Sequence, residues 1–223
     1  MSKKFRNDDE IFKFVEEQLY TAVVSDVMDD EGIVNQVMSE NLRPLTDTTR
    51  LVGRARTQLW VDNFEIVENN YENEIKAVDL LKKGDVSVHY CGYSGRIAPW
   101  GDLMSTASKM RGAHGAIIDG LVRDVNQIRK MNFPVFCTGI RPLDSKGRGV
   151  VVDYDVPIQC GGVLVRSGDL VIGDYDGVVV IPKEVEQLVL EKAHEKVTKE
   201  NFTRQELLDG KMLLDVYRKY GVL

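Results

Sequence analysis

The sequence predicts a single α/β domain in which short strands occupy the centre, with helices at both ends and one helical stretch inserted in the middle. The chain has 223 residues, 43% of them hydrophobic, which is enough for one sizeable core. Short apolar runs alternate with amphipathic stretches, as expected where strands alternate with helices. No Ser/Pro-rich linker divides the chain. We therefore expect one domain over residues 1–223, with a helical C-terminal extension over about 183–223.

The N-terminal half begins with helical patterns and continues into alternating elements. Residues 8–20 place apolar side chains on one broad face, which predicts an amphipathic helix, and a second helix is expected to begin near Ser25. Residues 51–60 alternate as a strand does, with a kink at Gly53. The elements expected next are a helix over 71–81, a strand over 86–90, a loop over 91–99 and a short helix over 102–111.

The C-terminal half is richer in strands and ends in helices. Its expected elements are a strand over 116–119, a helix over about 124–131, a strand over 134–138 and β-like segments over 150–156, 163–166 and 169–173. Residues 174–177 read Asp-Tyr-Asp-Gly, a hairpin signal before a buried strand over 178–181. Pro182 is expected to start a long helix. Thr203 and Glu206 have the spacing of a capping box, which predicts the start of a last helix.

Composition excludes several classes of function. The formal net charge is −6 and no block of Lys and Arg stands out, so we expect no nucleic-acid partner. The longest apolar runs fall far below the roughly 20 residues of a membrane span, and no apolar segment follows the basic N-terminus as in a secretory signal. Cys91, Cys137 and Cys160 are odd in number and scattered, which indicates reduced thiols. These features together predict a cytoplasmic protein without membrane contact.

The spacing of three charged residues predicts a functional site. Asp102 is followed by twenty residues and then by Arg123 and Asp124. Gly101 and Asp102 open one expected helix, residues 120–124 open the next, and a short apolar strand lies between them. A helix–strand–helix path of this length can fold back and bring both acidic ends close together. Two carboxylates and a guanidinium at the starts of two helices suit a divalent metal and an anionic substrate.

Each of these residues also has a structural interpretation. Asp124 and Gln127 have the form of a capping box, and a single acidic residue at a helix start usually serves as a cap. Asp102, preceded by Gly101, has the same alternative. Arg123 could simply form an ion pair at the surface.

The functional interpretation combines all of them at one site. Helix N-termini offer unpaired N–H groups, so the amides near Leu103 and Met104 could hold a carboxylate. The planar guanidinium of Arg123 could grip the same anion and stabilise charge that develops on an oxygen. Asp124 could bind a hard cation such as Mg²⁺ or Mn²⁺, with waters filling most other positions.

A series of short motifs runs in order from about residue 20 to residue 220. These motifs are TAVVSDVMD (21–29), RP (43–44), LVGRART (51–57), WGDL (100–103), RGA (111–113), DG (119–120), RD (123–124), FPVF (133–136), VPI (156–158), CGGV (160–163), GDLV (168–171) and DGV (176–178). In these motifs the chain resembles the metal-dependent 4-hydroxy-4-methyl-2-oxoglutarate aldolases. These are class II pyruvate aldolases, grouped with the regulator of ribonuclease activity A.

The resemblance implies a fold, an assembly and a site. The implied fold is a layered β/β/α structure of the swivelling-domain type with flanking N- and C-terminal helices. The implied assembly is a homotrimeric or hexameric ring with active sites between subunits. By resemblance, Asp124 binds the metal, Arg123 binds pyruvate and supports its enolate, and Asp102 orients a metal-bound water. The substrate carboxylate would lie on the backbone from Gly101 through Leu103 to Met104.

The resemblance also implies an acidic residue from the C-terminal helix of a neighbouring subunit. Glu200 is the best match for this residue, and Glu195 is close by in the sequence. Ribonuclease regulators of this type carry a small residue where Asp102 stands, so Asp102 favours the catalytic branch.

The activity that the resemblance implies is retro-aldol cleavage of a 4-hydroxy-2-oxo acid, similar to 4-hydroxy-4-methyl-2-oxoglutarate, to pyruvate. The expected cofactor is Mg²⁺ or Mn²⁺, and oxaloacetate decarboxylation is an expected side activity. The first alternative is a non-catalytic, ribonuclease-regulator-like ring that binds a protein. The second is a metal-dependent lyase or hydrolase acting on another small acid.

Overall fold

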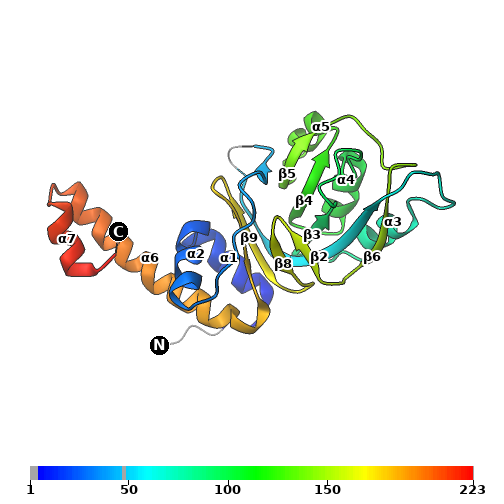
Figure 1. The fold of residues 1–223 in the computed structure, drawn as a ribbon. Helices are drawn as coiled ribbons and strands as arrows, with labels where there is room; N and C mark the ends of the chain where they lie inside the picture. Colours follow the sequence, from blue (N-terminus) through cyan, green and yellow to red (C-terminus); the bar gives the residue numbers. More distant parts are fainter. Residues whose placement is uncertain (1–4, 47–48, 223) are drawn as a thin grey trace.

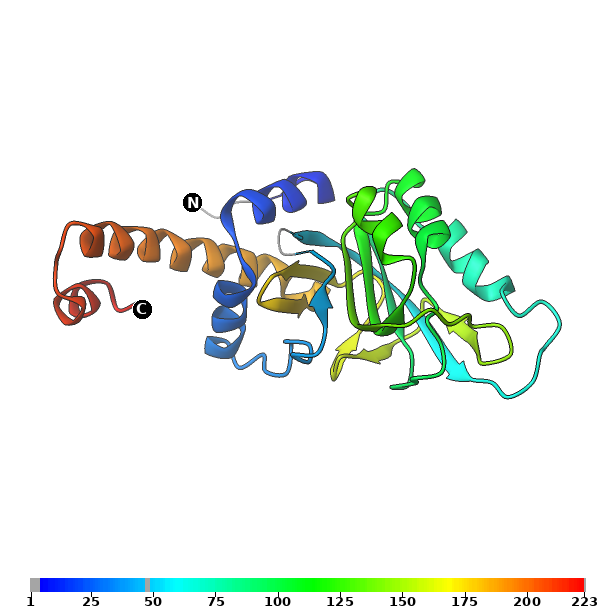
Figure 2. The ribbon, with the colours of Figure 1, turned by 90° about the horizontal axis from the view of Figure 1, so that it is seen from above.

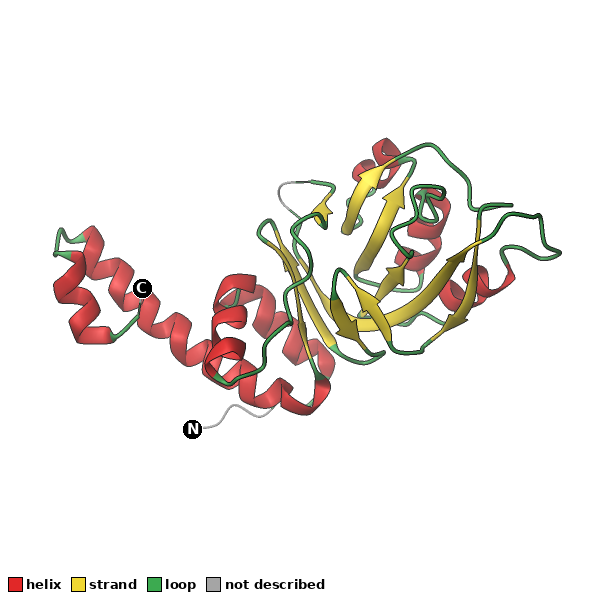
Figure 3. Ribbon diagram, in the orientation of Figure 1, coloured by secondary structure: helices red, strands yellow, loops and turns green. Residues whose placement is uncertain are grey.

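The structure is a computed structural model that describes residues 5–46 and 49–222. Helices and strands alternate through the middle of the chain, and helices occupy both ends (Figure 3). The helices are α1 (Asp8–Gln18), α2 (Thr21–Asp30), α3 (Glu72–Asp79), α4 (Asp102–Met110), α5 (Val125–Lys130), the 3₁₀ turn η1 (Lys183–Val185), α6 (Glu186–Leu208) and α7 (Leu213–Tyr220). The strands are β1 (Arg43–Pro44), β2 (Leu51–Asp62), β3 (Asp85–Tyr90), β4 (Gly115–Val122), β5 (Val135–Ile140), β6 (Gly149–Tyr154), β7 (Ile158–Cys160), β8 (Val163–Val165), β9 (Leu170–Asp174) and β10 (Gly177–Ile181).

The main sheet is mixed and strongly curved (Figure 1). Its strand order is β1-β5-β4-β3-β2-β9-β10, with β6 also paired to β2. Strands β2 to β5 run parallel to their neighbours in this group, whereas β9, β10, β6 and β1 join antiparallel. The long strand β2 pairs with β9 at its start, with β3 in its middle and with β6 at its end. One strand therefore connects all the antiparallel strands except β1 to the parallel group.

Side chains of β4 show how the layers are arranged. Successive residues of a strand point to opposite faces of the sheet. Ala116 and Ile118 belong to the core cluster that α3, α4 and α5 cover, while Ile117 belongs to the cluster beneath the small β7–β8 sheet. The domain thus consists of a small sheet, the main sheet and a helical layer. The predicted β/β/α fold with flanking terminal helices is confirmed.

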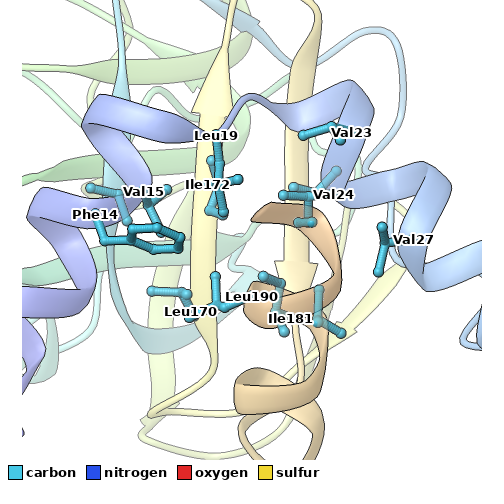
Figure 4. Close-up of a cluster of buried hydrophobic side chains, with 14 of the residues drawn as sticks. Phe14, Val15, Leu19, Val23, Val24, Val27, Leu170, Ile172, Ile181 and Leu190 are labelled. Atoms are coloured by element: carbon cyan, nitrogen blue, oxygen red, sulfur yellow. The ribbon is translucent and has the colours of Figure 1, made fainter. Parts of the chain in front are cut away.

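A third core cluster lies beneath the terminal helices. Helices α1, α2 and the first half of α6 pack over β9 and β10, where Val24, Leu190, Ile172 and Ile181 are all buried (Figure 4). The second half of α6 and α7 extend away from this body as an arm (Figures 1 and 2). The arm exposes the apolar side chains of Phe202, Leu208, Met212, Leu213, Leu214 and Tyr217.

One predicted helix start and one predicted strand end were wrong. Helix α2 begins at Thr21 instead of near Ser25, because the amide and hydroxyl of Thr21 both donate to the Asp174 carboxylate, at 2.9 and 2.7 Å. Strand β4 extends to Val122 instead of ending near residue 119, because Leu121 and Val122 still pair with β5. Residues 120–122 therefore belong to the strand, and the following helix begins at residue 125, which confirms the helix predicted over about 124–131.

The predicted helix start at Thr203 was also wrong. Helix α6 is continuous from Glu186 to Leu208, and Thr203 is buried inside it. Instead of completing a capping box, Glu206 accepts hydrogen bonds from Lys219 and Tyr220 at 2.6 and 3.1 Å, which ties α7 to α6. Pro182 precedes the 3₁₀ turn rather than opening the α-helix.

Candidate active site

The end of β4 and the start of α4 meet at one pocket. The Arg123 amide donates to the carbonyl of Trp100 at 2.9 Å, and Trp100 and Val122 form an isolated parallel bridge. Because the two segments run side by side here, Gly101 and Asp102 lie beside Arg123 and Asp124. The structure therefore brings together the three charged residues that the sequence spacing singled out.

Asp124 occupies the N-cap position of α5, but it does not form the capping box of its structural interpretation. Its backbone is left-handed, with φ of 57°, and its side chain makes no capping hydrogen bond. The carboxylate turns instead toward α4, where Oδ2 lies 3.4 Å from the Asp102 amide nitrogen, which donates to it, and 3.6 Å from Nε of Arg123. Non-glycine residues in this conformation are uncommon, and Asp and Asn are enriched among them. The turn aims a partly exposed carboxylate into the pocket.

The start of α4 presents backbone N–H groups to the same pocket. Gly101 occupies the N-cap position and Asp102 is the first helical residue, so Asp102 is not the cap that its alternative interpretation required. The first backbone bond of the helix runs from the Ser105 amide to the Gly101 carbonyl at 3.1 Å. The amides of Leu103 and Met104 consequently have no acceptor within the helix. They and the positive end of the helix dipole can hold an anion.

Arg123 lies between two carboxylates. Its Nε is 3.6 Å from Asp124, and its Nη1 is 3.5 Å from Oδ1 of Asp144 in the loop after β5. The hydroxyl of Tyr71 donates to the other oxygen of Asp144 at 2.6 Å. Burial by itself would raise the pKa of Asp144, but the hydrogen bonds from Tyr71 and from the Ser145 amide, with the charge of Arg123, lower it. Asp144 is therefore ionised at neutral pH.

Glu74 of α3 also faces this pocket, although only 5% of it is exposed to solvent. Its Oε2 has no hydrogen-bond partner in the part of the chain that the structure describes. Burial raises the pKa of Glu74 to about 8; the charge of Asp144 adds to this shift and that of Arg123 opposes it. A buried carboxylate without donors is costly, so the neutral acid is the form favoured at pH 7.

The pocket has a volume of about 200 Å³ and two distinct ends. We call the region of Asp102 and Asp124 the aspartate end, and that of Tyr71, Glu74 and Asp144 the Glu74 end. The residues that line the whole pocket are Tyr71, Glu74, Ile75, Ala98, Pro99, Gly101, Asp102, Leu103, Met104, Arg123, Asp124, Asp144 and Ser145. Sequence reasoning missed every residue of the Glu74 end.

The aspartate end fits a hard divalent cation. Among the described residues, Asp124 accepts only one long hydrogen bond, so its carboxylate has lone pairs to spare. Among the described residues no group of three or more His, Cys, Asp or Glu side chains lies close enough to enclose a metal. Asp102 and Asp124 both line this end of the pocket, and a small number of carboxylates suits Mg²⁺ or Mn²⁺, since these ions accept several water ligands.

Glu195 and Glu200 of α6 lie away from this pocket within the same chain. Glu200 contacts the Tyr20 hydroxyl and faces a hollow between α2 and α6 that Arg204 also lines. Glu195 lines a different hollow, beside Lys192 and Lys196. Both belong to α6, whose second half leads away from the main sheet (Figure 1), whereas Asp124 lies between β4 and α5. The contribution of Glu200 from a neighbouring subunit stays a prediction.

The sequence and the fold of this chain have counterparts among known proteins. The model of the RraA-like family, described as Aldolase/RraA, matches residues 21–180. The chain belongs to this family. In the described residues no helix combines the length and apolarity needed to cross a bilayer.

Three similar proteins illustrate the range of the family. A protein of Halalkalibacterium halodurans named "Putative 4-hydroxy-4-methyl-2-oxoglutarate aldolase" is 35% identical over 88% of this chain and 89% of its own length. A crystal structure described as one of novel cellulases from gut-associated microbes is 32% identical, with a TM-score of 0.83 over 92% of this chain and 90% of that one. RraAS2 of Streptomyces coelicolor, described as an unusual member of the RNase ES inhibitor RraA family, is 27% identical, with a TM-score of 0.79 over 91% of this chain and 99% of its own.

Proposed function

We propose that this protein is a divalent-metal-dependent lyase that cleaves a 4-hydroxy-2-oxo acid to pyruvate and a carbonyl compound. The observation that carries the proposal is the convergence of Asp102, Arg123 and Asp124 at the start of α4. The aldolase name of the relative at 35% identity supports the same class of reaction.

The backbone and Arg123 bind the keto acid. The amides of Leu103 and Met104 receive its carboxylate, and the guanidinium of Arg123 lies over the keto oxygen. Asp124, with Asp102, would hold Mg²⁺ or Mn²⁺ at the aspartate end. When bound, the ion supplies Lewis acidity at the keto oxygen.

Cleavage needs a proton acceptor and an electron sink. Asp102, acting through a water molecule, accepts the proton of the C4 hydroxyl. The C3–C4 bond breaks, its electron pair moves into the enolate of pyruvate, and C4 leaves as a carbonyl group. Arg123 stabilises the charge on the enolate oxygen, and a proton added at C3 completes pyruvate. The same sink accepts the electrons released when CO₂ leaves oxaloacetate, so we propose oxaloacetate decarboxylation as a side activity.

We also propose a homo-oligomer, trimeric or hexameric, in which Glu200 of a neighbouring chain completes the aspartate end. The apolar side chains exposed on the arm support association, because such patches mark interaction sites. The two carboxylates available within one chain support a contribution from another. Light scattering coupled to size-exclusion chromatography measures the assembly directly, and a monomer at working concentration would reject it.

The test of the activity is pyruvate release from 4-hydroxy-4-methyl-2-oxoglutarate and from oxaloacetate, with and without Mg²⁺ or Mn²⁺. Asp124→Asn is the matched variant, because Asn tolerates the left-handed backbone at this position and removes only the charge. We expect metal-dependent release in the wild type and its loss in Asp124→Asn, whose thermal unfolding should stay close to that of the wild type. Metal-independent release, or equal release by the variant, would reject the proposal.

A second candidate function follows from RraAS2, whose description places it among RNase ES inhibitors. A ring that binds a ribonuclease would need no metal and no Asp102. Absence of release from either compound, by protein shown to be folded and assembled, would favour this candidate. The presence of Asp102 at the start of α4 supports the lyase.

A further inference from the structure

We propose that Glu74 is a substrate-binding residue that donates a hydrogen bond to a hydroxyl group on C5 of the substrate. The preferred substrate is then a 4,5-dihydroxy-2-oxo acid with a single carboxylate, and the leaving product is a hydroxy-aldehyde. This inference rests on the proposed lyase activity and specifies the part of the substrate that becomes the carbonyl product.

The first step is the state of Glu74 itself. It is 95% buried, lines the pocket and leaves Oε2 without a partner in the described chain. As a neutral acid it carries one O–H donor, and its carbonyl oxygen remains an acceptor. A ligand group that accepts this hydrogen bond would give the buried acid a partner that the described part of the chain does not supply.

The second step is the position of Glu74 relative to the reacting carbons. Arg123 lies between Asp124 and Asp144, so the Glu74 end begins on the side of the guanidinium away from the aspartate end. With C1 to C3 of the keto acid held at the aspartate end, the chain beyond C4 extends toward Asp144 and Glu74. The pocket of about 200 Å³ leaves room there for a small group only.

The third step is the charge of the Glu74 end. The groups that face it are Tyr71 from the start of α3, Asp144 from the loop after β5, Arg123 from the end of β4 and, at the other end of the pocket, Asp102 and Asp124. Asp144 is ionised and already bonded to Tyr71. A second carboxylate on the substrate would be repelled by the negative charge of Asp144. Arg123 would not fully offset this repulsion, because its guanidinium also serves the aspartate end of the pocket.

A hydroxyl group satisfies both acids at once. It can donate its proton in a hydrogen bond to the ionised Asp144 and accept a hydrogen bond from the neutral Glu74. A methyl group would leave Glu74 unpaired, and a carboxylate would be repelled by Asp144. Sites built to hydrogen-bond a substrate hydroxyl reject analogues that lack it, because the buried polar groups are then left without partners.

Three substrates that all release pyruvate test the proposal. They are 4,5-dihydroxy-2-oxopentanoate, 4-hydroxy-2-oxopentanoate, which lacks the C5 hydroxyl, and 4-hydroxy-4-methyl-2-oxoglutarate, which carries a carboxylate at C5. We expect the wild-type holoenzyme to favour the dihydroxy acid in kcat/KM at least about tenfold over each of the others. Equal or inverted preference in the wild type would overturn the proposal.

Variants at position 74 connect the preference to this residue. Glu74→Leu should raise KM for the dihydroxy acid about tenfold and lower KM for 4-hydroxy-2-oxopentanoate, because its methyl group then leaves no acid unpaired. Glu74→Gln, whose amide still donates, should keep the preference. Glu72→Gln, on the exposed side of the same helix, is the matched control and should change nothing. A Glu74→Leu enzyme that keeps the preference, or loses both activities equally while folded, would contradict the proposal.

The pH dependence of KM separates substrate binding by Glu74 from a merely structural role of this residue. Burial raises the pKa of Glu74 to about 8, so in the wild type KM for the dihydroxy acid should rise above that pH as the donor is lost. Glu74→Gln should show no such rise, and a rise of equal size in the variant would contradict the assignment.

Exchange of pyruvate methyl protons for deuterium, followed by NMR, tests the aspartate end alone. Its absence together with absence of all cleavage would reject the proposed function, whereas exchange without a Glu74 effect would reject only this inference.

Discussion

A Cβ atom at position 101 would lie 2.5 Å from Oδ2 of Asp124. Gly101 is therefore in contact with the carboxylate that we propose as the metal ligand, and any larger residue must displace it. The same added atom would lie 3.3 Å from Cγ of Arg123. The absence of a side chain at position 101 is what allows the start of α4 to approach both charged residues.

The first prediction concerns this contact. Gly101→Ala should lower kcat/KM for pyruvate release at least about tenfold, because small displacements of positioning groups are costly to catalysis. Gly95→Ala is the matched control, since nothing lies within 4 Å of a Cβ at that position. Steady-state kinetics and thermal unfolding of both variants check the prediction. An active Gly101→Ala enzyme would show that the geometry of Asp124 is not needed.

The second prediction concerns Arg123. Arg123→Ala should fold normally and lose about 10²- to 10³-fold in kcat, the range found when a group that stabilises a developing oxyanion is removed. Arg111→Ala removes an arginine of nearly equal exposure, 40% against 39%, whose ion pair with Asp79 lies outside the pocket. Single-turnover and steady-state measurements on both variants test the role. Comparable losses in the two variants would remove Arg123 from the mechanism.

The approach of Asp102 to Asp124 could be predicted from the sequence because it depends on local patterns. A helix start, one buried strand and a second turn follow one another within about 25 residues, and a single reversal of the chain brings the ends together. The conformation of Asp124 could not be predicted in this way. Its neighbours Leu121 and Val122 stay in the sheet through pairing with β5, so the chain must turn sharply at Asp124 itself.

The Glu74 end was hidden because burial is a property of the tertiary structure. Helical spacing places Glu74 on the same face of α3 as Ala77 and Val78, but a single glutamate on such a face does not by itself indicate a buried acid or the pocket that it lines. It is covered because α3 packs against β6, where the side-chain amide of Asn73 donates to the Val151 carbonyl at 3.0 Å. Such contacts join segments that are far apart in the sequence.

The third prediction concerns the buried histidine of β3. The Trp60 indole N–H donates to Nδ1 of His89 at 3.0 Å, so Nδ1 is an acceptor and the imidazole proton is on Nε2, 2.8 Å from Oγ of Ser87. Burial lowers the pKa of His89 to about 3. Nitrogen-15 NMR should show the neutral Nε2–H tautomer without titration between pH 8 and pH 5. The His89 signal is assigned by its loss in the His89→Gln variant. Titration of that signal near pH 6.5 in the wild type would contradict the prediction.

The last prediction concerns the stability of the metal-free protein. Burial raises the pKa of Glu74 from 4.5 to about 8, so the folded state binds this proton more tightly than the unfolded state. The contribution of Glu74 to stability therefore decreases as pH rises from about 4.5 to about 8, and it is constant outside that window. Glu74→Gln removes this dependence, so the free energy of unfolding of the variant, relative to that of the wild type, should rise across the window by at most about 5 kcal/mol.

Urea unfolding of both proteins at pH 5, 6.5 and 8 measures the difference, and Glu72→Gln should follow the wild type. A free energy of unfolding that changes with pH equally in Glu74→Gln and the wild type would mean that Glu74 is already ionised in the folded protein. The Glu74 end would then lack the hydrogen-bond donor that we propose for it.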